Sequence, residues 1–111
     1  MELPLQISLH GIAHSSALYD AIREKATKLE RYYNHIMSCR VVLELAARHQ
    51  RKGQQYAVHI DLKVPGGEIA VTHAHDEDLQ VALREAFDAA RRRLEDYARK
   101  QRGDVKQHGS P

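Results

Sequence analysis

The spacing of apolar residues changes along this chain, and this change limits the fold more than any other feature. Where apolar residues occupy every second position, a strand with one buried face is expected. Where they recur every three or four positions, a helix with one buried face is expected. Four segments alternate and two longer ones have the helical spacing. The alternating segments are residues 5–11, 40–48, 55–64 and 68–74, and the helical ones follow Ser15 and Asp78.

The first helix is expected to begin at Ser15, whose hydroxyl can accept a hydrogen bond from a free backbone N–H of the first turn. Behind it, one apolar stripe continues for about five helical turns. Because the same residues would be unpatterned in a strand, the spacing favours a helix. The stripe consists of Leu18, Ile22, Ala26, Leu29, Tyr33 and Ile36.

The second helix is expected to run from Asp78 to Gly103, where glycine stops it. Asp76, Glu77 and Asp78 stand at its start, where the positive end of the helix dipole favours anions. Residues 103–111 have no apolar pattern and are predicted to be a flexible tail or the stub of a linker, leaving residues 1–102 as the folded domain. The apolar stripe of this helix consists of Leu79, Leu83, Ala86, Phe87, Ala90, Leu94 and Tyr97.

The order β-α-β-β-β-α predicts a two-layer α+β sandwich. The last three strands are joined by a polar hairpin loop, "HQRKGQ", and by the turn Pro65–Gly67, so they should form an antiparallel meander. Each strand has one apolar face, which two amphipathic helices can cover while the other face meets water. The expected fold therefore has both helices on one face of a four-stranded sheet.

Composition supports one small intracellular domain. A chain of 111 residues can form one core, and without tryptophan that core should be aliphatic. Cys39 is the single cysteine, which excludes an intramolecular disulfide and suits a reducing compartment. The N-terminus lacks the basic and apolar regions of a signal peptide, and no segment has the ~20 apolar residues of a membrane span. We therefore expect a cytoplasmic protein that does not contact membranes.

The second helix carries many arginines among its acids, and this pattern has two interpretations. Asp88 precedes Arg92 by four residues and Glu95 precedes Arg99 by four, a spacing that favours pairs within a solvated helix. Alternatively, the cations exceed the acids from Arg91 onward and provide a surface for RNA phosphates. Cations of the first helix and of the hairpin loop (Arg48, Arg51 and Lys52) would extend this surface. The few tyrosines are predicted to be core or flank residues, which disfavours a platform that stacks single-stranded bases.

An enzyme is not expected. The stretch "HAHDED" (residues 73–78) suggests a metal site, but its carboxylates are explained as dipole partners of the following helix, and no second ligand cluster is evident. Cys39 is interpreted as a core residue, and His14–Ser15–Ser16 as a helix cap. We therefore predict no catalytic residue, no metal, no cofactor and no small-molecule substrate.

The chain resembles the bacterial ribosome hibernation-promoting factors, also called ribosome-associated inhibitors or sigma-54 modulation proteins. The resemblance covers most of residues 3–102. It rests on the order and spacing of several stretches, namely "SSALYDAIREKATKLERYYNHI", "VVLEL", "PGGEI", and the Asp78–Leu79 and Arg92–Leu94 steps. It implies a fold like that of double-stranded-RNA-binding domains. It also implies a protein that binds small-subunit rRNA in the decoding channel, where mRNA and tRNAs bind, and so inhibits translation on idle ribosomes.

Carried over by position, the resemblance implies that Lys25, Lys28 and Arg92 contact rRNA. Charge alone adds six neighbours, namely Arg31, Arg84, Arg91, Arg93, Arg99 and Lys100. Three positions depart from the family pattern, where Gln80 replaces a common tyrosine, and Ala89 and Asp96 replace lysines; "HAHDED" also contains one extra residue. The tail resembles a linker that leads to a cold-shock domain in one branch of the family. The alternative function is a protein-interaction module that associates through a sheet edge without binding RNA.

Overall fold

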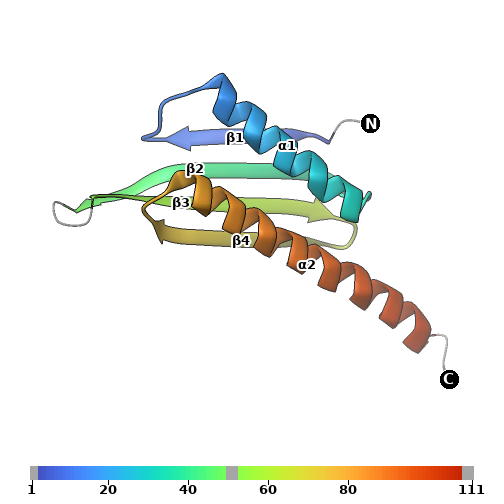
Figure 1. Ribbon diagram of the computed structural model, residues 1–111. Coiled ribbons are helices and arrows are strands. Elements are labelled where there is room, and N and C mark those ends of the chain that lie inside the picture. Colours follow the sequence, from blue (N-terminus) through green and yellow to red (C-terminus); the bar gives the residue numbers. More distant parts are fainter. Residues whose placement is uncertain (1–2, 50–52, 109–111) are drawn as a thin grey trace.

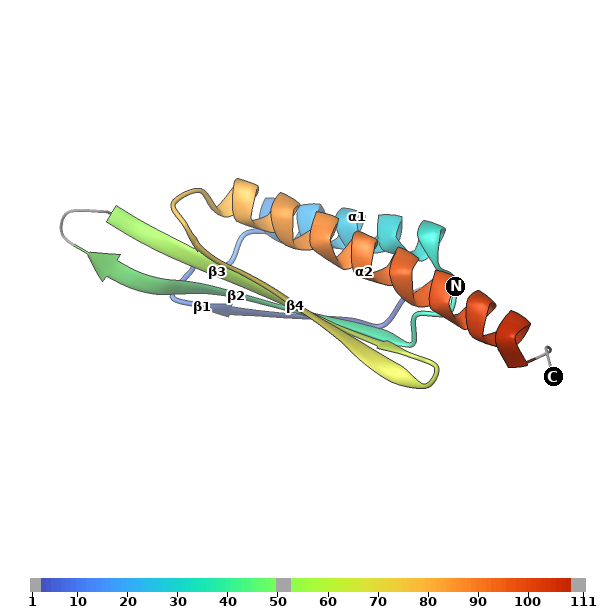
Figure 2. The same cartoon turned by 90° about the horizontal axis from the view of Figure 1, so that it is seen from below.

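Four strands and two helices follow one another in the predicted order (Figure 1). The computed structural model describes residues 3–49 and 53–108. Both helices lie on the same face of the sheet, as the side view in Figure 2 shows, so the predicted two-layer α+β sandwich is confirmed. The elements are β1 (Leu5–His10), α1 (Ser16–Tyr32), β2 (Ser38–His49), β3 (Gly53–Val64), β4 (Gly67–Asp76) and α2 (Leu79–His108).

The sheet has the strand order β1-β2-β3-β4, with one parallel pair and two antiparallel pairs. Strand β1 runs parallel to β2, because α1 carries the chain back across the sheet between them. Strands β2, β3 and β4 form the predicted antiparallel meander. At the β3–β4 turn, Pro65 is followed by Gly66 with φ of 85°, as a type II turn requires. Strands β1 and β4 are therefore the edges of the sheet.

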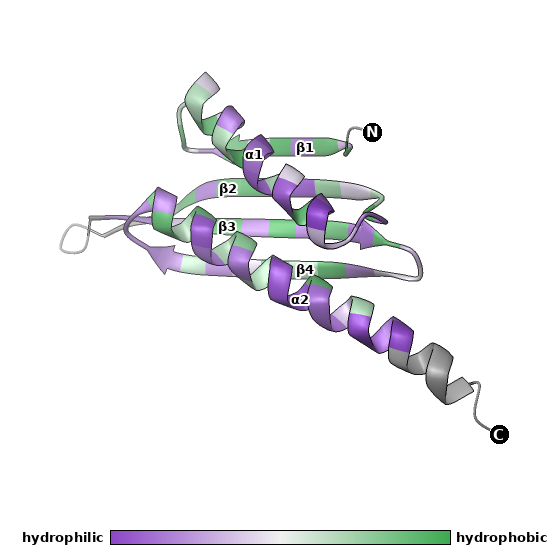
Figure 3. Ribbon diagram, turned by 45° about the vertical axis from the view of Figure 1, so that its right-hand side comes forward, coloured by the Kyte–Doolittle hydropathy of each residue, from purple (hydrophilic) through white to green (hydrophobic). Residues whose placement is uncertain are grey.

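The core lies between the sheet and the two helices, and it is mainly aliphatic, as predicted. Alternate residues of β2 and β3 face it, for example Val41 and Ile60, which are both fully buried. No polar or charged side chain is buried within the parts of the chain that the structure describes. Figure 3 shows the corresponding alternation of hydrophobic and hydrophilic residues along the helices and strands. Packing of apolar surface therefore holds the two layers together.

Both helices begin at side-chain caps. The Leu18 N–H donates to Ser15 Oγ over 3.1 Å, which confirms the predicted cap of α1. At the start of α2, the Gln80 and Val81 N–H groups donate to Asp78 Oδ1 over 2.9 and 3.3 Å. Asp78 thus acts as a hydrogen-bonding cap, in addition to the dipole partner that the sequence predicted.

Both predicted helix ends were wrong. Helix α1 ends at Tyr32, and Tyr33 is already extended with φ of −153°, because the chain must turn there to reach β2 at Ser38. Helix α2 continues through Gly103 to His108, since one glycine inside a helix costs only about 1 kcal/mol relative to alanine. Of the predicted tail, residues 109–111 lie outside the described residues, and its role as a linker stays a prediction.

The pairing of β3 with β4 contains a β-bulge within "HAHDED". The β3–β4 register passes from Val58 opposite His73 to Tyr56 opposite Asp76, so β4 has one more residue than β3 over this step. His75, inside this step, has φ of 63°, the left-handed region that non-glycine residues seldom adopt. At the β2–β3 connection, Arg51, Lys52 and the side chain of Arg48 lie outside the part of the chain that the structure describes.

Candidate nucleic-acid interface

The outer surface of the two helices holds the excess of positive charge. Helices α1 and α2 contain twelve Lys and Arg residues against eight Asp and Glu, whereas the four strands contain three against four. Because both helices cover one face of the sheet, these cations lie in a single layer (Figure 2). We call the solvent-facing side of α1 and α2 the helical surface.

Three of the predicted rRNA contacts lie on α1. Lys25 is half-buried, while Lys28 and Arg31 are exposed. Lys28 Nζ lies 3.6 Å from Glu24 Oε1, and both side chains are more than half exposed, so this pair contributes little to stability. Lys25, Lys28 and Tyr32 follow each other at steps of three and four residues and therefore lie along one flank of α1.

That flank of α1 faces α2. The guanidinium carbon of Arg91 lies 5.6 Å from the centre of the Tyr32 ring, a cation–π contact between the two helices. Arg91 Nε is also 3.7 Å from Glu95 Oε1. Lys25, which is half-buried on this flank, therefore lies toward α2, whereas the exposed Lys28 also lines a cleft with Asp20 and Glu24 on the outer side of α1.

The other cations of α2 point in different directions. Arg92 and Lys100 are exposed, and neither pairs with a carboxylate within the described part of the chain. Arg93 instead donates to the backbone oxygen of Ala70 over 3.2 Å, which ties α2 to the edge strand β4. Arg93 is thus partly engaged in holding the two layers together.

The intrahelical ion pairs differ from those predicted. Arg92 does not pair with Asp88, and Arg99 lies 3.7 Å from Asp96 and not beside Glu95. Arg84 pairs with its neighbour Glu85 over 3.7 Å. Such distances exceed those of hydrogen bonds, and exposed pairs of this kind contribute at most about 1 kcal/mol. A phosphate can therefore replace the carboxylate at these arginines at little cost.

The structure thus brings the predicted site residues into one layer. Lys25, Lys28 and Arg92, which the resemblance selected, all lie on the two helices, and among the described side chains only Lys28 of these three is paired with an acid. The sites of departure lie on the same layer: Gln80 and Asp96 are exposed and Ala89 is half-buried. Asp96 places a negative charge beside Arg99, among the arginines of α2.

The residues considered for other chemistry have structural explanations. Burial, together with the nearby Asp61 carboxylate, raises the pKa of Cys39 to about 12, so its thiol stays protonated at neutral pH. His73 Nε2 is 3.0 Å from Asp76 Oδ2, and hydrogen bonds from the Asp78 N–H and His73 lower the pKa of Asp76. Across residues 3–49 and 53–108, no three His, Cys, Asp or Glu side chains form a metal-binding group.

The sequence analysis missed the role of the aromatic residues at the end of α1. Tyr32 was predicted only as a core or flank residue; it lies on the flank of α1, with 54% of its surface exposed. The sequence indicated this exposure in part, because Tyr33, and not Tyr32, continues the apolar stripe of the first helix.

The described helices include none that is long and apolar enough to cross a bilayer.

Comparison with known proteins identifies the family to which this chain is similar. A family model described as Sigma 54 modulation protein / S30EA ribosomal protein matches residues 5–102. The ribosome hibernation promoting factor of Azotobacter vinelandii is 29% identical over 99 residues, which is 89% of this chain and 86% of the relative. The factor of the same name from Pseudomonas putida is 26% identical over 99 residues, covering 87% of this chain and 90% of the relative.

Solved structures share the fold. The N-terminal domain of Protein Y from Thermus thermophilus has a TM-score of 0.72 at 24% identity, covering 86% of this chain and 99% of that domain. A ribosomal subunit interface protein from Coxiella burnetii has a TM-score of 0.73 at 16% identity, covering 86% and 98% of the two chains. The match to the family model spans every strand and the part of α2 that carries the arginines. This chain therefore belongs to the Sigma 54 modulation protein / S30EA ribosomal protein family.

Proposed function

We propose that this protein binds the small ribosomal subunit through its helical surface and inhibits translation by occupying the decoding channel. The excess of cations on α1 and α2, on one layer of the molecule, carries this proposal. Membership of the family and relatives named ribosome hibernation promoting factor support it. In this function the protein is a binding protein and not an enzyme.

The proposed contacts are mainly to RNA phosphates. Lysines and arginines that displace counterions from phosphates give affinity and position, whereas sequence is read by contacts to bases. The exposed cations on the two helices suit a folded RNA recognised by its shape and backbone. The proposed rRNA contacts are Lys25, Lys28, Arg31, Arg84, Arg91, Arg92, Arg93, Arg99 and Lys100, with Arg93 the weakest candidate because it already binds Ala70.

The test is co-sedimentation with purified small subunits through a sucrose cushion. Lys28→Glu combined with Arg92→Glu should abolish pelleting. The matched control is Arg40→Glu combined with Lys63→Glu, which changes the net charge equally on the opposite face of the sheet, where both residues are exposed. Circular dichroism melts of both double variants establish that they are folded.

Equal loss of pelleting in both double variants would show that total charge, and not the helical surface, governs binding. Unchanged pelleting of the Lys28 and Arg92 variant would refute the proposed site. Self-association that persists at high salt, without any pelleting, would favour the alternative, a module that pairs through a sheet edge. Inhibition of a reconstituted translation reaction by the wild-type protein, and not by the helical variant, would establish the inhibitory role.

A further inference from the structure

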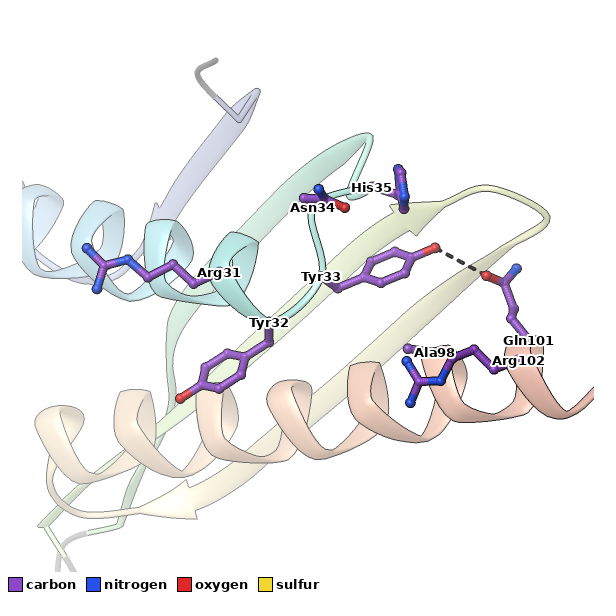
Figure 4. Close-up of a pocket in the computed structure, with 8 residues that line it drawn as sticks. All are labelled: Arg31, Tyr32, Tyr33, Asn34, His35, Ala98, Gln101 and Arg102. Atoms are coloured by element: carbon purple, nitrogen blue, oxygen red, sulfur yellow. Dashed lines mark hydrogen bonds between the residues drawn. The ribbon is translucent and has the colours of Figure 1, made fainter.

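An open cleft of about 780 Å³ lies where the end of α1 meets the C-terminal half of α2 (Figure 4). Its walls come from the last residues of α1, from the segment that follows, and from α2. The residues that matter for its chemistry are Arg31, Tyr32, Tyr33, Asn34, Gln101 and Arg102. Its volume falls in the range of ~300–1,000 Å³ that is usual for small-ligand sites. We call it the end-of-helix cleft.

One wall of the cleft is held rigid. Tyr33 donates from its hydroxyl to Gln101 Oε1 over 3.4 Å, and its ring meets the Tyr97 ring edge-on at a centroid distance of 5.8 Å. Gln101 Nε2 in turn donates to the Tyr97 hydroxyl over 2.7 Å. These contacts join residues far apart in the sequence, so the cleft is formed before any ligand arrives.

A second aromatic ring is exposed at the same cleft. Tyr32 is 54% exposed, although an aromatic side chain gains more free energy by burial. The Arg91 guanidinium, 5.6 Å from the ring centre, restricts its movement. An exposed ring held in one orientation is suited to stacking on another flat group.

The charge of the cleft is positive. Arg31 and Arg102 line it, both are exposed, and neither pairs with a carboxylate within the described part of the chain. No Asp or Glu is among its lining residues. By contrast, the lining of a neighbouring cleft along α1 mixes acids with cations and includes no described aromatic residue; its charged residues are Asp20, Arg23, Glu24, Lys28 and Arg31.

We propose that the end-of-helix cleft holds one unpaired nucleotide of the bound RNA. The base stacks on the Tyr32 ring, and the 5′-phosphate meets Arg102, whose side chain extends toward Tyr32 in Figure 4, whereas Arg31 points away from it along α1. Unpaired bases of structured RNA are commonly recognised by stacking on aromatic rings, and arginine forks match phosphate oxygens. This inference rests on the proposed function and adds base recognition to its phosphate contacts.

The first test uses the isolated protein and single nucleotides. AMP, GMP, CMP, UMP, adenosine, ribose 5-phosphate and inorganic phosphate are titrated separately while backbone amide signals are followed by NMR. We expect the four nucleotides to shift signals of residues 31–35 and 98–102, and to bind more tightly than adenosine or ribose 5-phosphate. Equal binding of ribose 5-phosphate and the nucleotides, or shifts confined to other residues, would overturn the proposal.

Matched variants separate the ring from the charge. Tyr32→Ala should weaken nucleotide binding at least about fivefold, because base stacking on an aromatic residue accounts for that much or more, whereas Tyr32→Phe should stay within about twofold. Arg102→Gln should remove the preference for AMP over adenosine. Arg40→Gln, on the far face of the sheet, serves as the charge-matched control and should bind like the wild type. Tighter binding of a hexaglutamate peptide than of any nucleotide would indicate that the cleft binds an acidic protein segment and not RNA, and it would refute the proposal.

Co-sedimentation distinguishes this inference from the proposed function. If the wild-type protein pellets with small subunits but Tyr32→Ala binds subunits and nucleotides like Tyr32→Phe, the cleft proposal fails and the proposed function stands. If nucleotides bind the cleft but neither the wild-type protein nor any variant pellets with subunits, the proposed function fails and nucleotide binding by the cleft stands. Where the wild-type protein pellets with subunits, ultraviolet cross-linking of that complex should place a nucleotide on the peptide that contains Tyr32 and Tyr33, and cross-links found only elsewhere would contradict the cleft proposal.

Discussion

The helical surface and the open face of the sheet, which the helices do not cover, are both exposed to water, but their charged residues are arranged differently. On the open face, opposite charges stand across neighbouring strands: Arg40 is in register with Asp61, and Lys63 with Glu68. There His59 also lies 2.8 Å from Glu44 Oε1 and 3.0 Å from Thr72 Oγ1. The helical surface has more cations than its acids can neutralise. A face that balances its own charge needs no charged partner, whereas one with surplus charge is suited to bind a polyanion.

The largest expected effect separates the two sides of the same strand. Leu43 is fully buried beneath the helices, whereas its neighbour Val42 is half-buried on the open face. Leu43→Ala should lower the free energy of unfolding by about 2–5 kcal/mol, because it leaves a cavity in the core. Val42→Ala should cost about 1 kcal/mol or less. Urea unfolding measures both, and equal losses would contradict the assignment of a single buried face.

The second expected effect is a dependence of the free energy of unfolding on pH, which comes from the buried thiol of Cys39. Its pKa is near 9.0 in ordinary surroundings and about 12 in the fold. Between these values the thiol ionises in the unfolded chain but stays protonated in the fold. The unfolded state then binds fewer protons, and the free energy of unfolding falls as pH rises, by up to about 1.4 kcal/mol per pH unit.

Urea unfolding at about pH 8 and about pH 10, on the wild type and on Cys39→Ala, isolates this effect because the variant lacks the thiol. The wild type should lose more stability over this interval than the variant does. Below pH 9 the thiol is protonated in both states and contributes no pH dependence. The same slope in both proteins would show that the Cys39 pKa is not raised.

Single charge changes should alter binding to small subunits in opposite directions. Arg92→Gln should reduce the salt dependence, lowering the slope of log affinity against log salt by about 0.7–0.9, the value for one phosphate contact. Asp96→Asn should strengthen binding a few-fold, because it removes a negative charge beside Arg99. Arg40→Gln on the open face should change neither quantity. Affinities between about 50 and 200 mM salt provide the measurement, and equal slopes for Arg92→Gln and Arg40→Gln would contradict the proposed interface.

The smallest effect is expected for the polar network of the open face. His59→Gln should change the free energy of unfolding by less than about 1 kcal/mol, since both hydrogen bonds of His59 lie at the surface. It should leave pelleting with small subunits unchanged. A loss of pelleting would mean that the open face also takes part in binding, and the contrast between the two faces would then be wrong.

Much of the fold could be predicted because its signals are local. Periodicity located the elements, Ser15 marked the start of α1, and strand parity selected core residues such as Val41 and Ile60. The ends of the helices were less predictable. Glycine is only a weak helix breaker, so Gly103 did not end α2. The end of α1 at Tyr32 depends on where the next strand must begin.

The candidate site could be predicted only in part. Wheel positions placed the cations on the helices, but Arg99 pairs with Asp96 and not with Glu95, and Arg92 does not pair with Asp88 as spacing alone suggested. The preferred rotamers depend on the neighbouring helix, for example on the Tyr32 ring that contacts Arg91. Spacing along one helix contains no information about such contacts.

By itself the sequence determined the order of the elements, their buried faces and the excess of cations on two helices, since each follows from the spacing of residues close in the chain. Tertiary structure alone decided that β1 pairs with β2 in parallel and that the end-of-helix cleft exists. The cleft depends on the contact between Tyr33 and Gln101, which are 68 residues apart. Contacts over such distances form only when the whole core packs, and local patterns cannot specify them.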